Sequence, residues 1–435
     1  MHSARLVAID RLNGPEQYGE RQRFVRRLTR QQQRDEIRRA AETGGAAHFA
    51  RLLTLFSFVT RSSWQNRGPH EICCAATPAA YQCKSAATGD QDIASGMCNK
   101  LPGMKGEPGM PIAELTIDAR RLWQGEEPAD LPLAFVNLEA LGDAPESPVL
   151  PAYPLIGLGR RDHPFARHLD TVVEHPVGAE SLANAILAMP RAAATIIELL
   201  RILPKLSLDD GLTAESLAYA MLQGSAEHRQ WLAARAPANP SPPGRLALRR
   251  EGALLSVTLD RPTAGNAIDT AMRDDLHAVF SLAAIDPEIE RIVLQGKGRS
   301  FSLGAELAEF GTTTDPATAH AIRLRTLPAR ALLPCADRLE THVHAACVGA
   351  GLEIAAFSRR LTAASDAWFQ LPEVAMGILP GAGGCVSLTR RIGRQRAALM
   401  MLSGKRIAAK VALDWGLIDA IVDQPPAGDD GADMG

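Results

Sequence analysis

Three short segments of the sequence combine glycine, alanine and glutamate in a way that suits chemistry at a carbonyl group. The first, residues 301–307, is a small-residue turn after an expected strand, and the second, residues 347–353, carries an expected strand into a helix. The first N–H groups of a helix lack partners and carry a partial positive charge. Small side chains allow a ligand oxygen to approach such donors closely. Two turns of this kind that face each other would form an oxyanion hole.

The third segment, residues 369–373, ends in Glu373 and is followed by a glycine-rich stretch, residues 377–384. Taken singly, each segment is a weak signal, because glycine usually marks a tight turn and glutamate is usually solvated. The succession of all three segments along one region is what favours a functional site.

The region that must position these segments, residues 245–423, alternates between strand and helix patterns. Alternating apolar residues mark one half-buried strand: Leu255, Val257 and Leu259. A helix is expected from about residue 270, with one apolar stripe: Met272, Leu276, Val279 and Phe280. A buried strand is expected next, at residues 291–295. Such repeated alternation of strand and helix predicts a layered α/β fold.

The order of these segments resembles that of the crotonase superfamily, also called the enoyl-CoA hydratase/isomerase family. The resemblance runs without a large gap from about Leu246 to Asp423. It also includes shorter motifs, at residues 259–262, 266–267, 402–404 and 415–419. It implies that residues 245–423 form a crotonase-like core of repeated ββα units arranged in a spiral. It further implies that this core binds acyl-CoA thioesters.

The resemblance assigns the oxyanion hole to the two small-residue turns. Its donors would be the N–H groups of Ala305 and Ala350, which follow Gly304 and Gly349 in the chain. Negative charge develops on the thioester oxygen when an enolate forms. By analogy with measured oxyanion holes, each fixed donor in a dry pocket stabilises that charge by about 3–4 kcal/mol.

Glu353 and Glu373 fill the positions of the two glutamates that hydratases of the family use. Glu353 would take a proton from water, and Glu373 would deliver a proton to Cα of an α,β-unsaturated thioester. Gly381 would direct its N–H toward the catalytic water or toward Glu373. The implied reaction is the hydration of a 2-enoyl-CoA. CoA is part of this substrate, so neither a separate cofactor nor a metal is expected.

Other activities stay open, because the sequence departs from the family pattern at several positions. Glu306 replaces the usual aspartate, Ala350 and Ala345 stand where glycine is common, Leu303 replaces a smaller residue, and lysines are absent from residues 303–310. Isomerisation, thioester hydrolysis and oxygenation of an arylacetyl-CoA are the alternatives within the family. A non-catalytic CoA-binding protein is the alternative outside it. Family membership also implies a homotrimer or a hexamer.

Residues 111–236 have a periodicity of their own. Short strands are expected in four places: residues 112–118, 133–136, 155–158 and 171–173. Helical spacing follows over residues 179–202, where Pro190 should kink or divide the helix. A second helix is expected at about residues 213–234, with Thr213 and the nearby Ser216 as candidates to cap its start.

This region also contains a weak internal repeat. Residues 168–176 parallel residues 417–425, and the helices that follow residue 176 resemble the terminal helices of the crotonase family. We therefore interpret residues 111–236 as a smaller, degenerate crotonase-like α/β unit whose helices close the active site of residues 245–423. An unrelated helical module is the alternative.

The remaining segments differ in composition from both units. Residues 1–103 carry 15 Lys and Arg against 9 Asp and Glu. This stretch is interpreted as a non-native leader preceding a start at Met104 or Met110; a disordered extension and a basic arm or transit peptide are the alternatives. Residues 237–244 contain four prolines and are expected to form a linker. Residues 424–435 are expected to be a disordered tail.

The overall composition excludes several classes of protein. A formal net charge of −2 argues against a nucleic-acid-binding surface over the whole molecule. The longest apolar run is too short for a membrane helix, so neither nucleic acid nor a membrane is expected as a partner. Seven cysteines at irregular spacing fit a reducing cytoplasm better than a secreted disulfide framework.

Three further groups of residues are weaker candidates. The first lacks the paired spacing that structural zinc sites favour: Cys73, Cys74, Cys83 and Cys98. The second, His342 and His344, is expected to be hydrogen-bonded and partly buried, with substrate contact as the alternative. The third is expected to form a solvated helix face, with contact to CoA phosphates as the alternative: Arg390, Arg391, Arg394 and Arg396.

Overall fold

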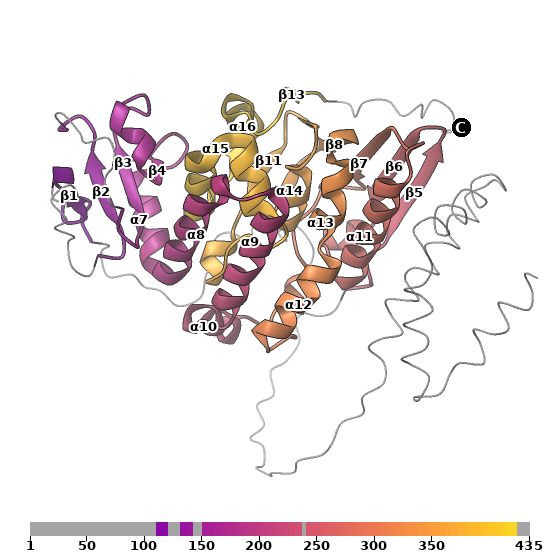
Figure 1. Ribbon diagram of the computed structural model, residues 1–435, viewed down its shortest axis with the longest axis horizontal. Coiled ribbons are helices and arrows are strands. Elements are labelled where there is room, and N and C mark those ends of the chain that lie inside the picture. Colours follow the sequence, from indigo (N-terminus) through magenta and orange to yellow (C-terminus); the bar gives the residue numbers. More distant parts are fainter. Residues whose placement is uncertain (1–109, 121–130, 142–149, 237–240, 424–435) are drawn as a thin grey trace, which may run out of the picture.

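The computed structural model describes four stretches of the chain, residues 110–120, 131–141, 150–236 and 241–423 (Figure 1). They form two units, which we name the N-terminal unit (residues 110–236) and the core unit (residues 241–423). The predicted leader and tail lie outside the described residues, as do the four cysteines before residue 100 and the first half of the predicted linker. No helix in the described stretches is long and apolar enough to cross a membrane.

The core unit is built on a six-stranded sheet with the strand order β13-β10-β8-β7-β6-β5. Its strands are β5 (Leu246–Glu251), β6 (Leu254–Leu259), β7 (Arg291–Gly296), β8 (Leu339–Val343), β10 (Arg360–Ala363) and β13 (Ala420–Ile421). β5 and β6 are antiparallel, and the other neighbours are parallel. The apolar face predicted for β6 is buried. The layered α/β architecture predicted for this region is therefore confirmed.

Helices pack on this sheet and connect it to a second, three-stranded sheet in the order β12-β11-β9 (Figure 1). The small sheet comprises β9 (Ala346–Val348), β11 (Trp368–Gln370) and β12 (Ile407–Ala408). The helices are α11 (Thr270–Ile285), α12 (Pro316–Thr326), α13 (Pro328–Leu332), α14 (Ala350–Ala355), α15 (Gly384–Ser403) and α16 (Ala409–Trp415). The apolar stripe predicted for α11 is buried as expected. Asp269 caps this helix by accepting a hydrogen bond from the N–H of Met272.

The N-terminal unit contains a four-stranded parallel sheet in the order β1-β2-β3-β4. The strands are β1 (Thr116–Ile117), β2 (Ala134–Asn137), β3 (Leu155–Leu158) and β4 (Thr171–Val172). Three of them match the predicted strands closely, but the strand expected at residues 112–118 is reduced to β1. The reason is a turn in which the N–H groups of Glu114 and Leu115 donate to the carbonyl of Pro111.

Four helices follow this sheet: α7 (Ala179–Ala188), α8 (Pro190–Ile202), α9 (Leu208–Gln223) and α10 (Ala226–Ala234). Pro190 divides the first pair, as predicted, because proline suits the first position of a helix and lacks an N–H. The cap predicted at Thr213 or Ser216 is wrong. Ser207 caps α9 instead, and Ser225 starts α10 after a break in the expected second helix. Both serines accept a hydrogen bond from the N–H three residues ahead.

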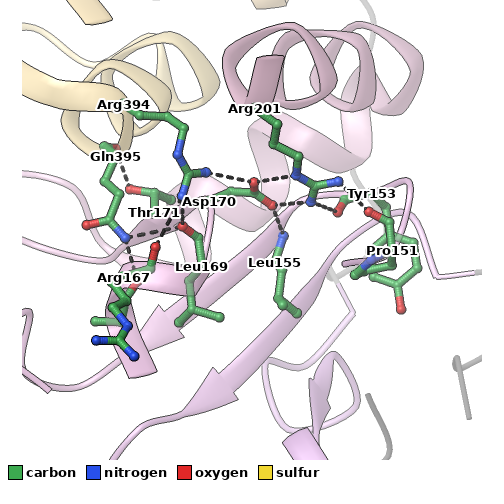
Figure 2. Close-up of polar contacts among 11 residues, drawn as sticks. Pro151, Tyr153, Leu155, Arg167, Leu169, Asp170, Thr171, Arg201, Arg394 and Gln395 are labelled. Atoms are coloured by element: carbon green, nitrogen blue, oxygen red, sulfur yellow. Dashed lines mark hydrogen bonds and ion pairs between the residues drawn. The ribbon is translucent and has the colours of Figure 1, made fainter. Parts of the chain in front are cut away.

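The N-terminal unit docks on the core unit mainly through α15, which contacts α7, α8, α9 and β4. Asp170 lies in this interface, and its side chain is only 1 % exposed. Its carboxylate accepts hydrogen bonds from Arg201 of α8, at 2.6 and 2.8 Å, and from Arg394 of α15, at 3.2 Å (Figure 2). The N–H of Leu155 donates to the same carboxylate at 2.9 Å. A buried charge is thus paired from both units.

The arginine-rich face of α15 is therefore not the solvated surface that the sequence predicts. Arg394 pairs with Asp170, Arg396 pairs with Glu174, and Arg391 pairs with Asp419. Only Arg390 of the four is exposed. The acidic partners lie beside β4 and β13, which belong to two different sheets. The sequence of α15 alone does not show these partners, so it predicted a solvent-exposed face.

The edge strands β4 and β13 are each preceded by an aspartate with the same arrangement of contacts. Asp170 exchanges hydrogen bonds with Leu155, because its N–H donates to the carbonyl of Leu155 and its carboxylate accepts from the N–H. Asp419 exchanges the same two bonds with Leu361. Each aspartate also pairs with an arginine of α15. This correspondence supports the proposal that the N-terminal unit is a degenerate copy of a crotonase-like unit.

Candidate active site

The two small-residue turns predicted from the sequence, in residues 301–307 and 347–353, lie side by side. Ser302 forms a parallel bridge with Cys347, so residues 301–304 run along β9 toward Gly349. Gly304 has a φ of +91°, and a Cβ added to it would lie 3.0 Å from the carbonyl oxygen of Val348. The same atom would lie 3.5 Å from Cα of Gly349. The absence of a side chain at Gly304 is thus what allows the turns to touch.

The N–H groups of Ala305 and Ala350 are both left without a partner in the described part of the chain. Ile268 pairs with the first turn through the carbonyl of Gly304 and the N–H of Glu306, which leaves the N–H of Ala305 on the other side of the strand. Ala350 begins α14, where an N–H has no acceptor inside the helix. Two unpartnered donors therefore belong to turns in direct contact.

The first turn is held in place by buried polar side chains. Asn266, at a φ of +54°, donates its side-chain amide to the carbonyls of Lys297, Ser300 and Phe301. Arg261 pairs with Glu306 at 2.8 Å, so the glutamate that replaces the usual aspartate has a buried partner. Such fully bonded groups fix the geometry of the backbone around them.

A second departure leaves strain near the other turn. Ala345 has a φ of +47°, a left-handed conformation that costs a residue with Cβ about 1–2 kcal/mol. This position precedes β9, which leads directly into Gly349. The positive φ at this position explains why glycine is common there in the crotonase family.

Glu353 lies on α14 with its side chain buried. One carboxylate oxygen accepts hydrogen bonds from the N–H of Ala382 at 2.6 Å and from the N–H of Gly384 at 2.8 Å. Burial raises the pKa of Glu353 to about 7, although these two donors lower it. The carboxyl group is therefore close to half-ionised near neutral pH.

Glu373 begins the short 3₁₀ helix η7 (Glu373–Met376) and is also buried. A Cβ added to Gly349 would lie 2.7 Å from Oε1 of Glu373, which places this carboxyl group against the second turn. Its Oε2 is buried and has no hydrogen-bond partner among the described residues. Burial raises the pKa of Glu373 well above its usual range, and the charge of Glu353 raises it further. Both effects favour the neutral form of this carboxyl group over the charged form.

The structure thus gathers Ala305, Ala350, Glu353 and Glu373 around one place. Gly381 lies next to this place, and its N–H contact with the catalytic water or with Glu373 stays a prediction. The N–H groups that donate to Glu353 are those of Ala382 and Gly384, and Gly381 packs against the ring of Tyr219. A Cβ added to Gly381 would lie 2.3 Å from Cδ2 of Tyr219.

Sequence reasoning missed two residues of α9 that reach this site, Glu215 and Tyr219. Burial raises the pKa of Tyr219; Arg323 lowers it, and the charges of Glu353 and Glu373 raise it. The ring therefore lies within electrostatic reach of both glutamates. In the sequence, only their spacing of four residues, which puts Glu215 and Tyr219 on one face of a helix, could have indicated that they act together.

The two histidines behave as predicted. His342 is buried and bonds to the hydroxyl of Thr362 at 3.0 Å, and His344 bonds to the carbonyl of Gly298 at 2.9 Å. Within the described residues, no group of three or more His, Cys, Asp or Glu side chains is arranged to hold a metal ion.

The core unit is similar in sequence to known proteins. Residues 249–427 match the family described as enoyl-CoA hydratase/isomerase. The chain is 36 % identical over 176 residues to 2,3-dehydroadipyl-CoA hydratase of Escherichia coli (strain K12), which covers 40 % of this chain and 68 % of that protein. It is 33 % identical over 177 residues to a mevalonyl-coenzyme A hydratase of Beauveria bassiana, covering 39 % and 63 %.

Among solved structures, an enoyl-CoA hydratase from Thermoplasma volcanium is 34 % identical, with a TM-score of 0.38, over 41 % of this chain and 72 % of that one. The chain spans about two thirds of the length of the curated relatives it matches. From the family match and the identity to these relatives, the chain belongs to the enoyl-CoA hydratase/isomerase family.

Proposed function

We propose that this protein hydrates a 2-enoyl-CoA thioester. The observation that carries the proposal is the pair of buried glutamates, Glu353 and Glu373, beside two unpartnered backbone donors. The family match, residues 249–427, contains all four groups, and relatives that this chain matches bear the name hydratase. An acyl-CoA substrate follows from the same family membership.

In the proposed reaction, water adds across the double bond conjugated to the thioester. Ionised Glu353 takes one proton from the water, and the water oxygen bonds to Cβ. The electrons of the double bond move onto the thioester oxygen. The N–H groups of Ala305 and Ala350 would hold that oxygen as an enolate. Protonated Glu373 then gives its proton to Cα, which restores the thioester carbonyl. The product is a 3-hydroxyacyl-CoA.

The different environments of the two glutamates support these roles. Two backbone N–H groups stabilise the charged form of Glu353. The buried Oε2 of Glu373 has no such donor. Mutual repulsion in a buried site disfavours ionisation of both at once, so the group whose Oε2 has no donor keeps the proton.

The first test is turnover of crotonyl-CoA by the full chain, followed as loss of the absorbance of the conjugated double bond. We expect conversion to 3-hydroxybutyryl-CoA, identified by mass spectrometry. Release of free CoA would indicate a hydrolase, and conversion only between double-bond isomers would indicate an isomerase. Binding without turnover for any chain length would contradict an enzymatic role.

The rate should depend on pH through Glu353. Below about pH 7 this base becomes protonated in the free enzyme, so kcat/KM should fall about tenfold for each further unit of pH. On the alkaline side, kcat/KM should fall only when Glu373 loses its proton, well above the usual glutamate range. Steady-state kcat/KM measured across this pH range checks both limbs, with circular dichroism as the control for unfolding. A flat acid limb through pH 7 would contradict the role of Glu353.

A further inference from the structure

A third buried glutamate, which the proposed reaction does not use, reaches the active site from the N-terminal unit. Glu215 lies on α9, and its side chain is 1 % exposed. Its carboxyl group accepts hydrogen bonds from the N–H of Gly383 at 2.7 Å and from the N–H of Cys385 at 2.9 Å. Glu215 precedes the segment matched by the family, residues 249–427.

Glu215 and Glu353 share one run of backbone donors at the start of α15. The N–H groups of Ala382 and Gly384 donate to Glu353, and those of Gly383 and Cys385, the alternate residues, donate to Glu215. We name residues 382–385 the shared turn. Gly383 has a φ of +106°, a conformation that glycine adopts without strain. Because the donors alternate, the two carboxyl groups hold the shared turn between them.

The fit of α9 against this region leaves no room for a substrate between them. A Cβ added to Gly211 would lie 3.2 Å from a methyl group of Val386. Tyr219 packs directly on Gly381, as described above. Gly211, Glu215 and Tyr219 are spaced four residues apart and so lie on one face of α9. Glu215 therefore acts on the backbone and not on a ligand.

We propose that Glu215 is a positioning residue for hydration, which holds the shared turn so that Ala382 and Gly384 fix the carboxylate of Glu353. This inference rests on the proposed function. It makes the N-terminal unit part of the machinery of the core unit, because the active-site base is aligned by a side chain from the other unit.

The test compares Glu215→Gln with a control on the same helix. The amide can accept from only one of the two N–H groups and places its own donor against the other. We expect kcat for crotonyl-CoA to fall about 10- to 100-fold, with KM changed less than about threefold, since the donors on Glu353 are displaced. Asp209→Asn removes an ion pair between α9 and Arg330 without touching the shared turn, and should keep the wild-type kcat.

A double variant separates positioning from a general structural role. If Glu215 acts through Glu353, Glu215→Gln should cause no further loss of kcat in a Glu353→Gln background. Independent losses that multiply in the double variant would overturn the proposal, and so would a wild-type kcat in Glu215→Gln.

A second readout does not depend on turnover. Amide hydrogen exchange at residues 382–385 should be faster in Glu215→Gln than in Asp209→Asn, because one of the two N–H groups loses its acceptor and faces a donor instead. Unchanged protection would overturn the proposal, whatever the kinetics. If the wild-type chain hydrates no enoyl-CoA, it is the proposed function that fails, and with it a role of Glu215 in hydration.

Discussion

Glu353→Gln should lower kcat for crotonyl-CoA by about 10³-fold, within the range usual for loss of a general base, while KM stays within a few-fold. An amide cannot accept the proton of the attacking water, so the chemical step loses its base. The glutamine oxygen can still accept the N–H groups of Ala382 and Gly384, which now donate to the carboxylate. The variant therefore changes proton transfer with little change in shape. Steady-state kinetics with matched binding measurements check this result.

Stability measurements separate this loss from unfolding. The pKa of Glu353 is raised in the folded protein, so the folded state binds its proton more tightly than the unfolded state does. Ionisation of this group therefore lowers stability as pH rises above the unfolded pKa, and a neutral glutamine avoids that penalty. We expect Tm at pH values above 7 to be equal to or higher than that of the wild type.

A matched control is available in Glu340, a buried glutamate of β8 that pairs with Arg291 and Arg359. Glu340→Gln removes the charge that these arginines face, so it should lower stability but not kcat. Full activity in Glu353→Gln would contradict the role of Glu353 as the base. An equal loss of kcat in both variants would indicate that removing any buried carboxylate damages the enzyme.

The parts of the site that the sequence predicts are those within short, continuous segments. Gly304 and Ala305 are neighbours, as are Gly349 and Ala350, and the order of such turns is visible without a structure. Glu353 follows the second turn within one helical turn, so its place is fixed by local geometry. Residues of this kind can be predicted from the sequence because their relative positions depend only on neighbouring residues.

The contacts that sequence reasoning missed join segments far apart in the chain. Glu215 accepts hydrogen bonds from backbone groups beyond residue 380, and Arg394 donates to Asp170 of the N-terminal unit. A helix pattern tells which residues share a face, but it does not tell which partner covers that face. This is why the arginines of α15 were assigned to solvent. The position of a cap was missed for a related reason, since Ser207 and Thr213 both suit the start of a helix.

The same contacts explain why the two units depend on each other. α15 begins at the shared turn and, past a break in helical geometry at Gly393, presents Arg394 to Asp170. The helix is therefore anchored to the N-terminal unit at two places, one beside the active site and one at the edge of β4. Loss of the second anchor should act on stability, because Asp170 contacts none of the groups assigned to the reaction.

Asp170→Asn should lower the free energy of unfolding by about 3 kcal/mol, near the lower end of the range for breaking a buried ion pair. The variant leaves Arg201 and Arg394, which contact Asp170 in Figure 2, facing a neutral amide. The aspartate is 1 % exposed. These arginines are 18 % and 20 % exposed, so water relieves part of the penalty, which places the value at the lower end. Urea unfolding of the full chain measures the change as a shift in midpoint.

Asp419→Asn is the matched control, because Asp419 makes the same backbone contacts at the edge of the other sheet and also pairs with an arginine of α15. Its side chain is 45 % exposed, so its ion pair is screened by water, and the loss should be about 1 kcal/mol or less. Both variants should keep the wild-type kcat at temperatures where they are folded. Equal destabilisation by the two would contradict the argument, since burial of Asp170 is the feature that separates two otherwise similar sites.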